Sequence, residues 1–144
     1  DPSAFFSPHD INVIGNTANI NNTVFGDIGS TVEFTDNTDA ELNKIDTDGT
    51  FVQSGSAVLN VKNNAFSAAQ VELNNGTFAA NRALTATTLN VNNGATLRGN
   101  GNITGTVNVN NGGTIAPGNS IDTLTVTGNV NFNTGSTTAI EINE

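Results

Sequence analysis

The sequence predicts an all-β protein, specifically a right-handed parallel β-helix, which is a solenoid with about 18–23 residues per rung. Three observations predict this fold. Asn and Thr make up about a third of the chain, and Asn suits turns while Thr suits strands, which disfavours helices. A short strand pattern followed by a turn recurs along the chain. Apolar and polar residues alternate within each copy, as in a half-buried strand.

The repeat is an alternating tripeptide followed by a turn rich in Asn and Gly. Its copies begin at residues 71, 89, 107 and 130, so the intervals are 18, 18 and 23 residues. The third interval is longer because a loop between Pro117 and Thr123 is inserted. An earlier, degenerate copy begins at Leu59. The tripeptides are Val71-Glu72-Leu73, Leu89-Asn90-Val91, Val107-Asn108-Val109 and Val130-Asn131-Phe132.

Each rung is predicted to contain three short strands. A second strand follows each turn, and a third apolar patch follows in several copies, for example at Leu84, Ile103 and Val126. Side chains of a strand alternate between its two faces, so the outer two residues of each tripeptide point inward and the middle one outward. Stacked rungs then form an inward core file of Leu73, Val91, Val109 and Phe132.

The turns are predicted to stack as well. Their Asn side chains are expected to form ladders that exchange amide hydrogen bonds between coils. Their glycines are expected to supply the positive φ angles of the corners, a conformation that Asn also tolerates.

The chain is predicted to be one domain, a single β-helix segment over residues 1–144, with irregular rungs in 1–87 and regular, stem-like rungs in 88–144. Residues 11–14, 19–21 and 23–25 are predicted strands, and Phe5–Pro8 a loop. The segment Ala40–Ile45 is either a helical turn or a rung with a longer insertion, and the rung is favoured. The chain begins at Asp1 without a Met and stops in mid-pattern, so we expect a longer parent. No apolar run is long enough to span a membrane.

Charge and cysteine content exclude several functions. The net charge is −9 with four basic residues, which disfavours binding to nucleic acid or to anionic lipid. The chain has no Cys, which excludes disulfides, thiol chemistry and Cys-based metal sites and suits an extracellular protein.

No catalytic, cofactor or metal site is predicted. The only histidine, His9, is expected to have a surface role. The acidic cluster of Asp36, Asp39, Glu41, Asp46 and Asp48 is read as a solvated loop. The segment Asp46–Gly49 resembles the start of a calcium loop, but the position that would need Glu is Ala57. Arg82 and Arg98 lack the aromatic neighbours expected of a ligand site.

One segment carries a family signature. Residues 112–126 read GGTIAPGNSIDTLTV and closely resemble the C-terminal passenger region of bacterial autotransporters, which use type V secretion. The resemblance is specific over about Thr88–Glu144 and only compositional before that. One departure is Asp122, where the family usually has Gly, although Asp can adopt the left-handed conformation. The stem motif comprises Gly113, Thr114, Ile115, Ala116, Pro117, Gly118, Asn119, Ser120, Thr123 and Leu124.

The resemblance implies a secreted β-helix at the surface of a Gram-negative bacterium, or released from it. A C-terminal translocator β-barrel of the same parent chain carries such a passenger through the outer membrane, and the stem-like, autochaperone-like region assists its folding. The Asn-rich, Trp-free composition resembles the large surface antigens of rickettsia-type bacteria. The expected role is therefore structural and adhesive, without enzyme activity. Expected partners are the barrel, a host surface receptor and further copies of the chain.

Two alternatives stay open. The chain could bind or degrade polysaccharide, as a phage tailspike or pectin lyase does, but the usual sugar-stacking residues Trp and Tyr are absent. It could also be a passive spacer that lifts an adhesive tip away from the membrane.

Overall fold

The computed structural model is built from strands throughout the part of the chain that it describes, namely residues 3–6, 11–13, 20–26, 29, 31–35, 37, 39–61 and 64–143. These residues form one 16-stranded sheet and no helix, which confirms the all-β prediction. The strands are β1 (Ser3–Phe6), β2 (Ile11–Val13), β3 (Ile20–Gly26), β4 (Thr31–Phe34), β5 (Ala40–Thr47), β6 (Thr50–Gln53), β7 (Val58–Val61), β8 (Phe66–Leu73), β9 (Gly76–Ala80), β10 (Leu84–Val91), β11 (Ala95–Gly99), β12 (Asn102–Val109), β13 (Thr114–Pro117), β14 (Thr125–Thr127), β15 (Val130–Phe132) and β16 (Thr137–Thr138).

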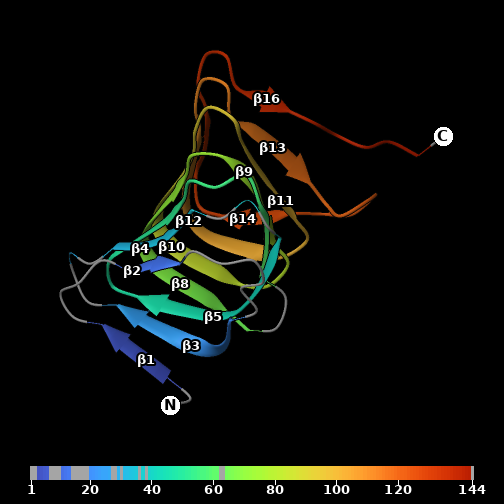
Figure 1. Cartoon of the computed structure of the whole chain (residues 1–144). Coiled ribbons are helices and arrows are strands. Elements are labelled where there is room, and N and C mark those ends of the chain that lie inside the picture. The colour runs from blue at the N-terminus through green and yellow to red at the C-terminus, as the bar shows by residue number, and fades with distance from the viewer. Residues whose placement is uncertain are drawn as a thin grey trace.

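The sheet is wound into a solenoid whose coils stack from the N-terminal to the C-terminal end (Figure 1). All pairs of named strands are parallel. Equivalent side chains of adjacent coils are 18 residues apart at Asn90 and Asn108 and 23 apart at Asn108 and Asn131. The predicted coil length is therefore confirmed.

Each regular coil has three faces. The first and second faces are the two halves of one bent strand, as in β8, β10 and β12, and the third face is the following short strand, as in β9, β11 and β13. In the last coil the first two faces separate into β14 and β15, which both pair with β12. The three predicted strands per rung are thus present, although a bend rather than a turn joins two of them.

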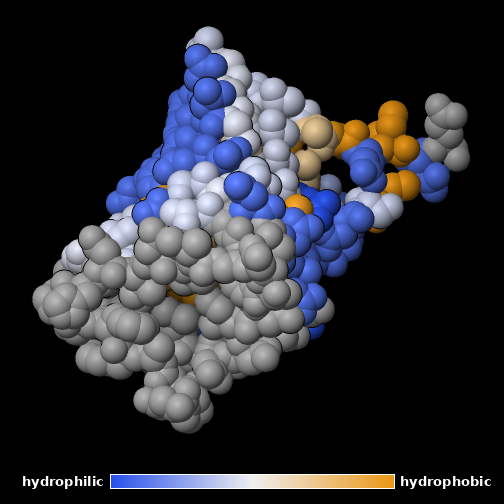
Figure 2. Space-filling model, in the orientation of Figure 1, coloured by the Kyte–Doolittle hydropathy of each residue, from blue (hydrophilic) through white to orange (hydrophobic). Residues whose placement is uncertain are grey.

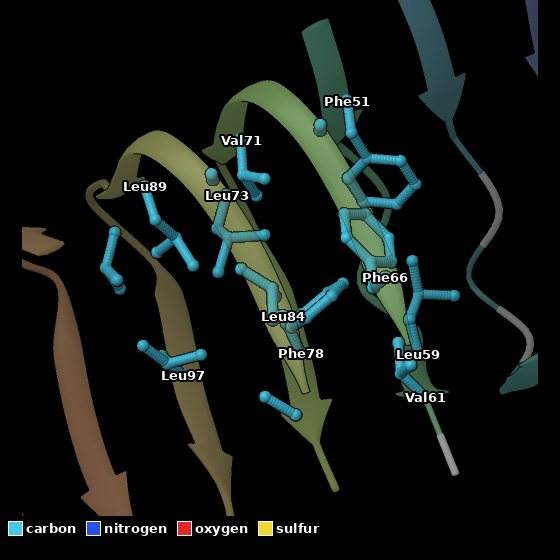
Figure 3. Close-up of a cluster of buried hydrophobic side chains, with 14 of the residues drawn as sticks. Phe51, Leu59, Val61, Phe66, Val71, Leu73, Phe78, Leu84, Leu89 and Leu97 are labelled. Carbon is cyan, nitrogen blue, oxygen red and sulfur yellow. The ribbon is translucent and has the colours of Figure 1, made fainter. Parts of the chain in front are cut away.

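The interior is filled by the inward residues of these strands. In β10 and β12 the last tripeptides place two apolar residues inside and one Asn on the outside. Four phenylalanine rings cluster in the core: Phe51 lies 5.4 Å from Phe34, 4.9 Å from Phe66 and 5.8 Å from Phe78, measured between ring centroids. Leucines continue the stack toward the C-terminal end (Figure 3).

Two polar side chains lie within this core. Gln53 is 1% exposed, and its Nε2 donates to the carbonyl oxygens of Ala57 at 2.8 Å and of Thr77 at 3.3 Å, while its Oε1 has no partner. The Oγ1 of buried Thr47 accepts from the backbone N–H of Gly49 at 3.0 Å. Both side chains satisfy backbone groups near the corners of their coils.

Several N-terminal expectations are corrected. Phe5 and Phe6 belong to β1 rather than to a loop, while Ser7 and Pro8 lie outside the described residues. Residues 20–26 form the single strand β3, with a register irregularity between Ile20 and Thr23. Residues 40–47 form β5, so the rung interpretation holds and the helical turn is wrong. β3 and β5 are stacked on both sides by strands of neighbouring coils, and β1 pairs with β3. This stacking favours the extended conformation over local preference.

Candidate functional site

The last coil of the solenoid is paired on one side only in the described structure and is therefore open to a partner. We call β14, β15 and β16 the open coil. β14 and β15 pair with β12, and β16 pairs with β13. Within the described residues, no strand pairs with the other side of these three. An unpaired parallel edge leaves backbone N–H and C=O groups available to a further strand.

Apolar side chains on the open coil are only partly covered. Leu124, Val126 and Val130 pack against the core but are partly buried. Phe132 stacks in register on Val109, yet its side chain is 57% exposed, whereas Val109 is fully buried. The tail beyond β16 leaves the solenoid and carries Ile140 and Ile142, both largely exposed (Figures 1 and 2).

The predicted core file is therefore buried in three of its four positions. Leu73, Val91 and Val109 are 0% exposed and lie in register with one another. Phe132, which was predicted to lie in the core, is 57% exposed, because no described strand lies on its far side. Its backbone register is as expected, so a covering coil would complete its burial.

The stem motif is distributed over a strand and a corner. Thr114, Ile115, Ala116 and Pro117 are β13, with Ile115 buried against the core, and Gly113 lies buried just before it. Gly118 forms an antiparallel bridge with Gly99 of the coil below, donating its N–H to the Gly99 carbonyl at 2.8 Å and accepting at 3.3 Å. Ser120 and Thr123 are exposed, and Leu124 enters the open coil. The motif lengthens one coil and leads directly into the open coil.

Side-chain amides attach this inserted loop to earlier coils. The Nδ2 of Asn119 donates to Asn81 Oδ1 at 2.6 Å, and the Nδ2 of Asn100 donates to Asp122 Oδ2 at 2.8 Å. The Asn100 hydrogen bond, and secondarily that from the Thr123 N–H, hold the pKa of the Asp122 carboxyl below its ordinary value of 3.8. Asp122 does not have a positive φ, since all described residues with positive φ are glycines. Asp122 therefore does not use the left-handed conformation that was open to it, and its side chain makes the contacts to Asn100 and Thr123 instead.

Two ladders of side-chain amides run along the outside of the second face toward the open coil. In the outer ladder, which lies at the turns, Asn92 donates to Asn74 at 2.8 Å, Asn110 to Asn92 at 2.7 Å and Asn133 to Asn110 at 2.6 Å. These bonds confirm the predicted turn ladder.

The inner ladder lies at the middle residues of the tripeptides. Asn131 donates to Asn108 at 2.8 Å, Asn108 to Asn90 at 2.8 Å and Asn90 to Glu72 Oε1 at 2.6 Å. Glu72 Oε2 also accepts from Asn92 Nδ2 at 2.9 Å, so one carboxylate stands at the base of both ladders. Sequence reasoning missed this ladder and Glu72. The signal was present, because Asn or Glu occupies every middle position.

The described residues of the acidic cluster lie on or beside β5, but they have separate partners. Asp39 accepts from the N–H of Val58 at 2.8 Å, and Asp46 lies 3.7 Å from Lys44 in a half-exposed ion pair. Among the residues that the structure describes, no group of three or more His, Asp or Glu side chains could hold a metal ion. His9 and Asp36 lie outside the described residues. Arg82 and Arg98 are exposed.

No family model, curated protein or solved structure matches this chain. Within the described part of the chain, no helix is long and apolar enough to cross a bilayer. The site must therefore be interpreted from its geometry: a half-paired coil, an incompletely covered phenylalanine and two amide ladders that both reach the same edge.

Proposed function

We propose that this chain is a stem segment of an autotransporter passenger, displayed at the surface of a Gram-negative bacterium or released from it. Its role is mechanical: the open coil accepts the next coil, and the stacked coils hold the passenger extended from the cell. The observation that carries the proposal is Phe132, which lies in register above buried Val109 but is itself 57% exposed. One further coil would remove this apolar surface from water.

The position of the stem motif supports the same role. Residues 113–124 form β13 and the corner that leads into the open coil, so the segment resembling the autotransporter stem adjoins the stacking edge. In such a parent chain, the partner at this end is the segment leading to the translocator β-barrel. Coils that emerge from the membrane would fold by adding to an already folded coil, because each coil buries its apolar face only by stacking.

A display assay tests the proposal. The chain is placed between a secretion signal and an outer-membrane translocator barrel, and surface exposure and protease resistance of the folded segment are measured on intact cells. We expect display of a protease-resistant segment. Phe132→Asp should reduce display while leaving the isolated chain folded, because it places a charge where the next coil must bury an apolar residue.

Two variants provide the comparison. Val109→Asp buries a carboxylate in the core and should abolish both folding and display, while Thr104→Asp adds the same charge at an exposed position of the same strand and should change neither. Equal display of the Phe132→Asp variant and the unsubstituted chain would show that the open coil has no stacking role. Binding of the isolated chain to host cells would assign it an adhesive role beyond that of a passive spacer.

A further inference from the structure

Glu72, the carboxylate at the N-terminal end of the two ladders, fixes the direction of their hydrogen bonds. A carboxylate accepts hydrogen bonds and does not donate them. Asn90 Nδ2 donates to Glu72 Oε1 at 2.6 Å, and Asn92 Nδ2 donates to Glu72 Oε2 at 2.9 Å. Both amides must therefore direct their NH2 groups toward the N-terminal coils. Their oxygens face the C-terminal end.

This direction is passed from coil to coil. A side-chain amide has donors on one side and an acceptor on the other, so an amide that donates below accepts from above. Asn108 donates to Asn90 at 2.8 Å, and Asn110 donates to Asn92 at 2.7 Å. Asn131 and Asn133 repeat the pattern in the open coil. The arrangement at Glu72 thus determines which atoms the last coil presents.

The open coil consequently offers two amide oxygens, Asn131 Oδ1 and Asn133 Oδ1, beside its unpaired backbone. We infer that Glu72 sets the direction of both ladders, and that the segment received by the open coil is a parallel strand bearing an Asn-x-Asn pair whose two NH2 groups meet these oxygens. The inference rests on the proposed function, because it names the partner of that same edge.

The chemistry of the ladder favours Asn at both positions of the partner. Asn has the right length, since the coils of this chain place Asn on Asn at the same two positions. Asp would bring acceptor oxygens against acceptor oxygens and leave both pairs without a proton to share. Lys would donate but could not continue the ladder.

An added coil tests the partner chemistry. A copy of residues 122–144 is appended after Glu144, which preserves the 23-residue spacing of Asn108 and Asn131. In a second version, Asp replaces the copied Asn131 and Asn133. Hydrogen exchange is measured at the backbone amides of Val130 and Phe132. The backbone groups of Asn129 and Asn133 bond to the coil below. Because successive residues of a strand point their backbone groups to opposite sides, the amides of Val130 and Phe132 face the added coil. The Asn coil should protect these amides at least about tenfold more than the Asp coil.

The role of Glu72 is tested by combining the added coils with Glu72→Gln. A Gln has one NH2 group where Glu72 has two acceptor oxygens, so only one of the two ladders can reverse and receive Asp. The preference for the Asn coil should then fall to that of a single mismatched amide pair. Glu72→Asp keeps a carboxylate, which only accepts hydrogen bonds, at the foot of the ladders, and it should keep the preference for the Asn coil. This variant shows whether a loss of preference in Glu72→Gln comes only from misfolding. Direct repulsion between Glu72 and the added Asp is minor, because four coil spacings, roughly 19 Å, exceed the Debye length of about 8 Å at 0.15 M salt.

Glu33→Gln is the matched control. Glu33 lies two coils below Glu72 in the same file, with Val52 between them, and it accepts from Ser54 Oγ at 2.6 Å rather than from a ladder. The Glu33→Gln substitution removes the same charge as Glu72→Gln and should leave the preference for the Asn coil intact. Equal loss of preference in Glu33→Gln and Glu72→Gln would overturn the role of Glu72. Equal protection by Asn and Asp coils would overturn the inference but leave the stacking edge, whereas no protection by the Asn coil would overturn the proposed function too.

Discussion

At the scale of single residues, Gly105 is the most constrained corner in the described C-terminal coils. Its φ is +136°, and a Cβ at this position would overlap the carbonyl oxygen of Ala86 in the coil below. Gly105→Ala therefore has to move backbone as well as adopt a strained conformation. We expect a loss of roughly 3 kcal/mol or more in the free energy of unfolding, measured by denaturant titration.

Gly94 provides the comparison at another corner. Its φ is +85°, and the nearest atom to an added Cβ is Asn75 Oδ1 at 3.7 Å. Gly94→Ala thus adds conformational strain without a clash and should cost about 1–2 kcal/mol. Equal losses for the two variants would mean that the contact between Gly105 and Ala86 does not limit the spacing of the coils.

The carboxyl of Asp122 gives a residue-scale prediction about pH. The Asn100 hydrogen bond is the main cause of its lowered pKa, so Asn100→Ala should raise that pKa toward 3.8. A pKa that is lower in the folded state stabilises the loop above the unfolded value, and this contribution is lost as pH falls through the folded value. Carbon-detected NMR titration of the Asp122 carboxyl measures the shift directly.

Asn119→Ala is the control for this titration. Asn119 belongs to the same loop but donates to Asn81 rather than to Asp122. Its replacement should loosen the loop while leaving both hydrogen bonds to the Asp122 carboxyl in place. If the pKa of Asp122 stayed unchanged in Asn100→Ala, the Thr123 N–H would be its main cause instead.

At the scale of elements, the strands that could be predicted are those in which apolar and polar residues alternate and a glycine turn follows directly. Leu89-Asn90-Val91 and Val107-Asn108-Val109 each place two buried residues around one outward Asn, and each is followed by a glycine turn. The segment Ala40–Ile45 was harder to predict, because its composition also suits a helical turn. Only the stacking of β5 between β3 and β7 makes the extended form favourable, and that contact is remote in sequence.

The candidate site was predictable in its position but not in its chemistry. The stem motif and the repeat led to the C-terminal coil, and the turn ladder followed from the Asn pattern. The exposure of Phe132 depends on what lies above the last coil, which a periodic pattern does not specify. The base at Glu72 depends on side-chain geometry between coils, since three donors, Gln70, Asn90 and Asn92, converge on it only after folding.

At the scale of the whole molecule, each coil contacts chiefly the coils above and below it. The phenylalanine cluster joins β4, β6, β8 and β9, and the amide ladders join the coils that follow. Stability in such a stack is close to a sum of coil and interface contributions. A complete coil should therefore be removable without loss of the fold, provided that every register position is preserved.

Deletion of residues 90–107 tests this modularity. Leu89 and Val107 are register partners, so joining Leu89 to Asn108 continues the strand and brings Asn108 to Glu72 in place of Asn90. The shortened chain should unfold cooperatively, with a loss of roughly 1–3 kcal/mol at about 0.05–0.15 kcal/mol per residue. Deleting residues 90–98 instead removes about half a coil and turns apolar side chains outward, so that chain should not fold. Circular dichroism during thermal unfolding distinguishes the two, and similar behaviour of both deletions would contradict a register-locked stack.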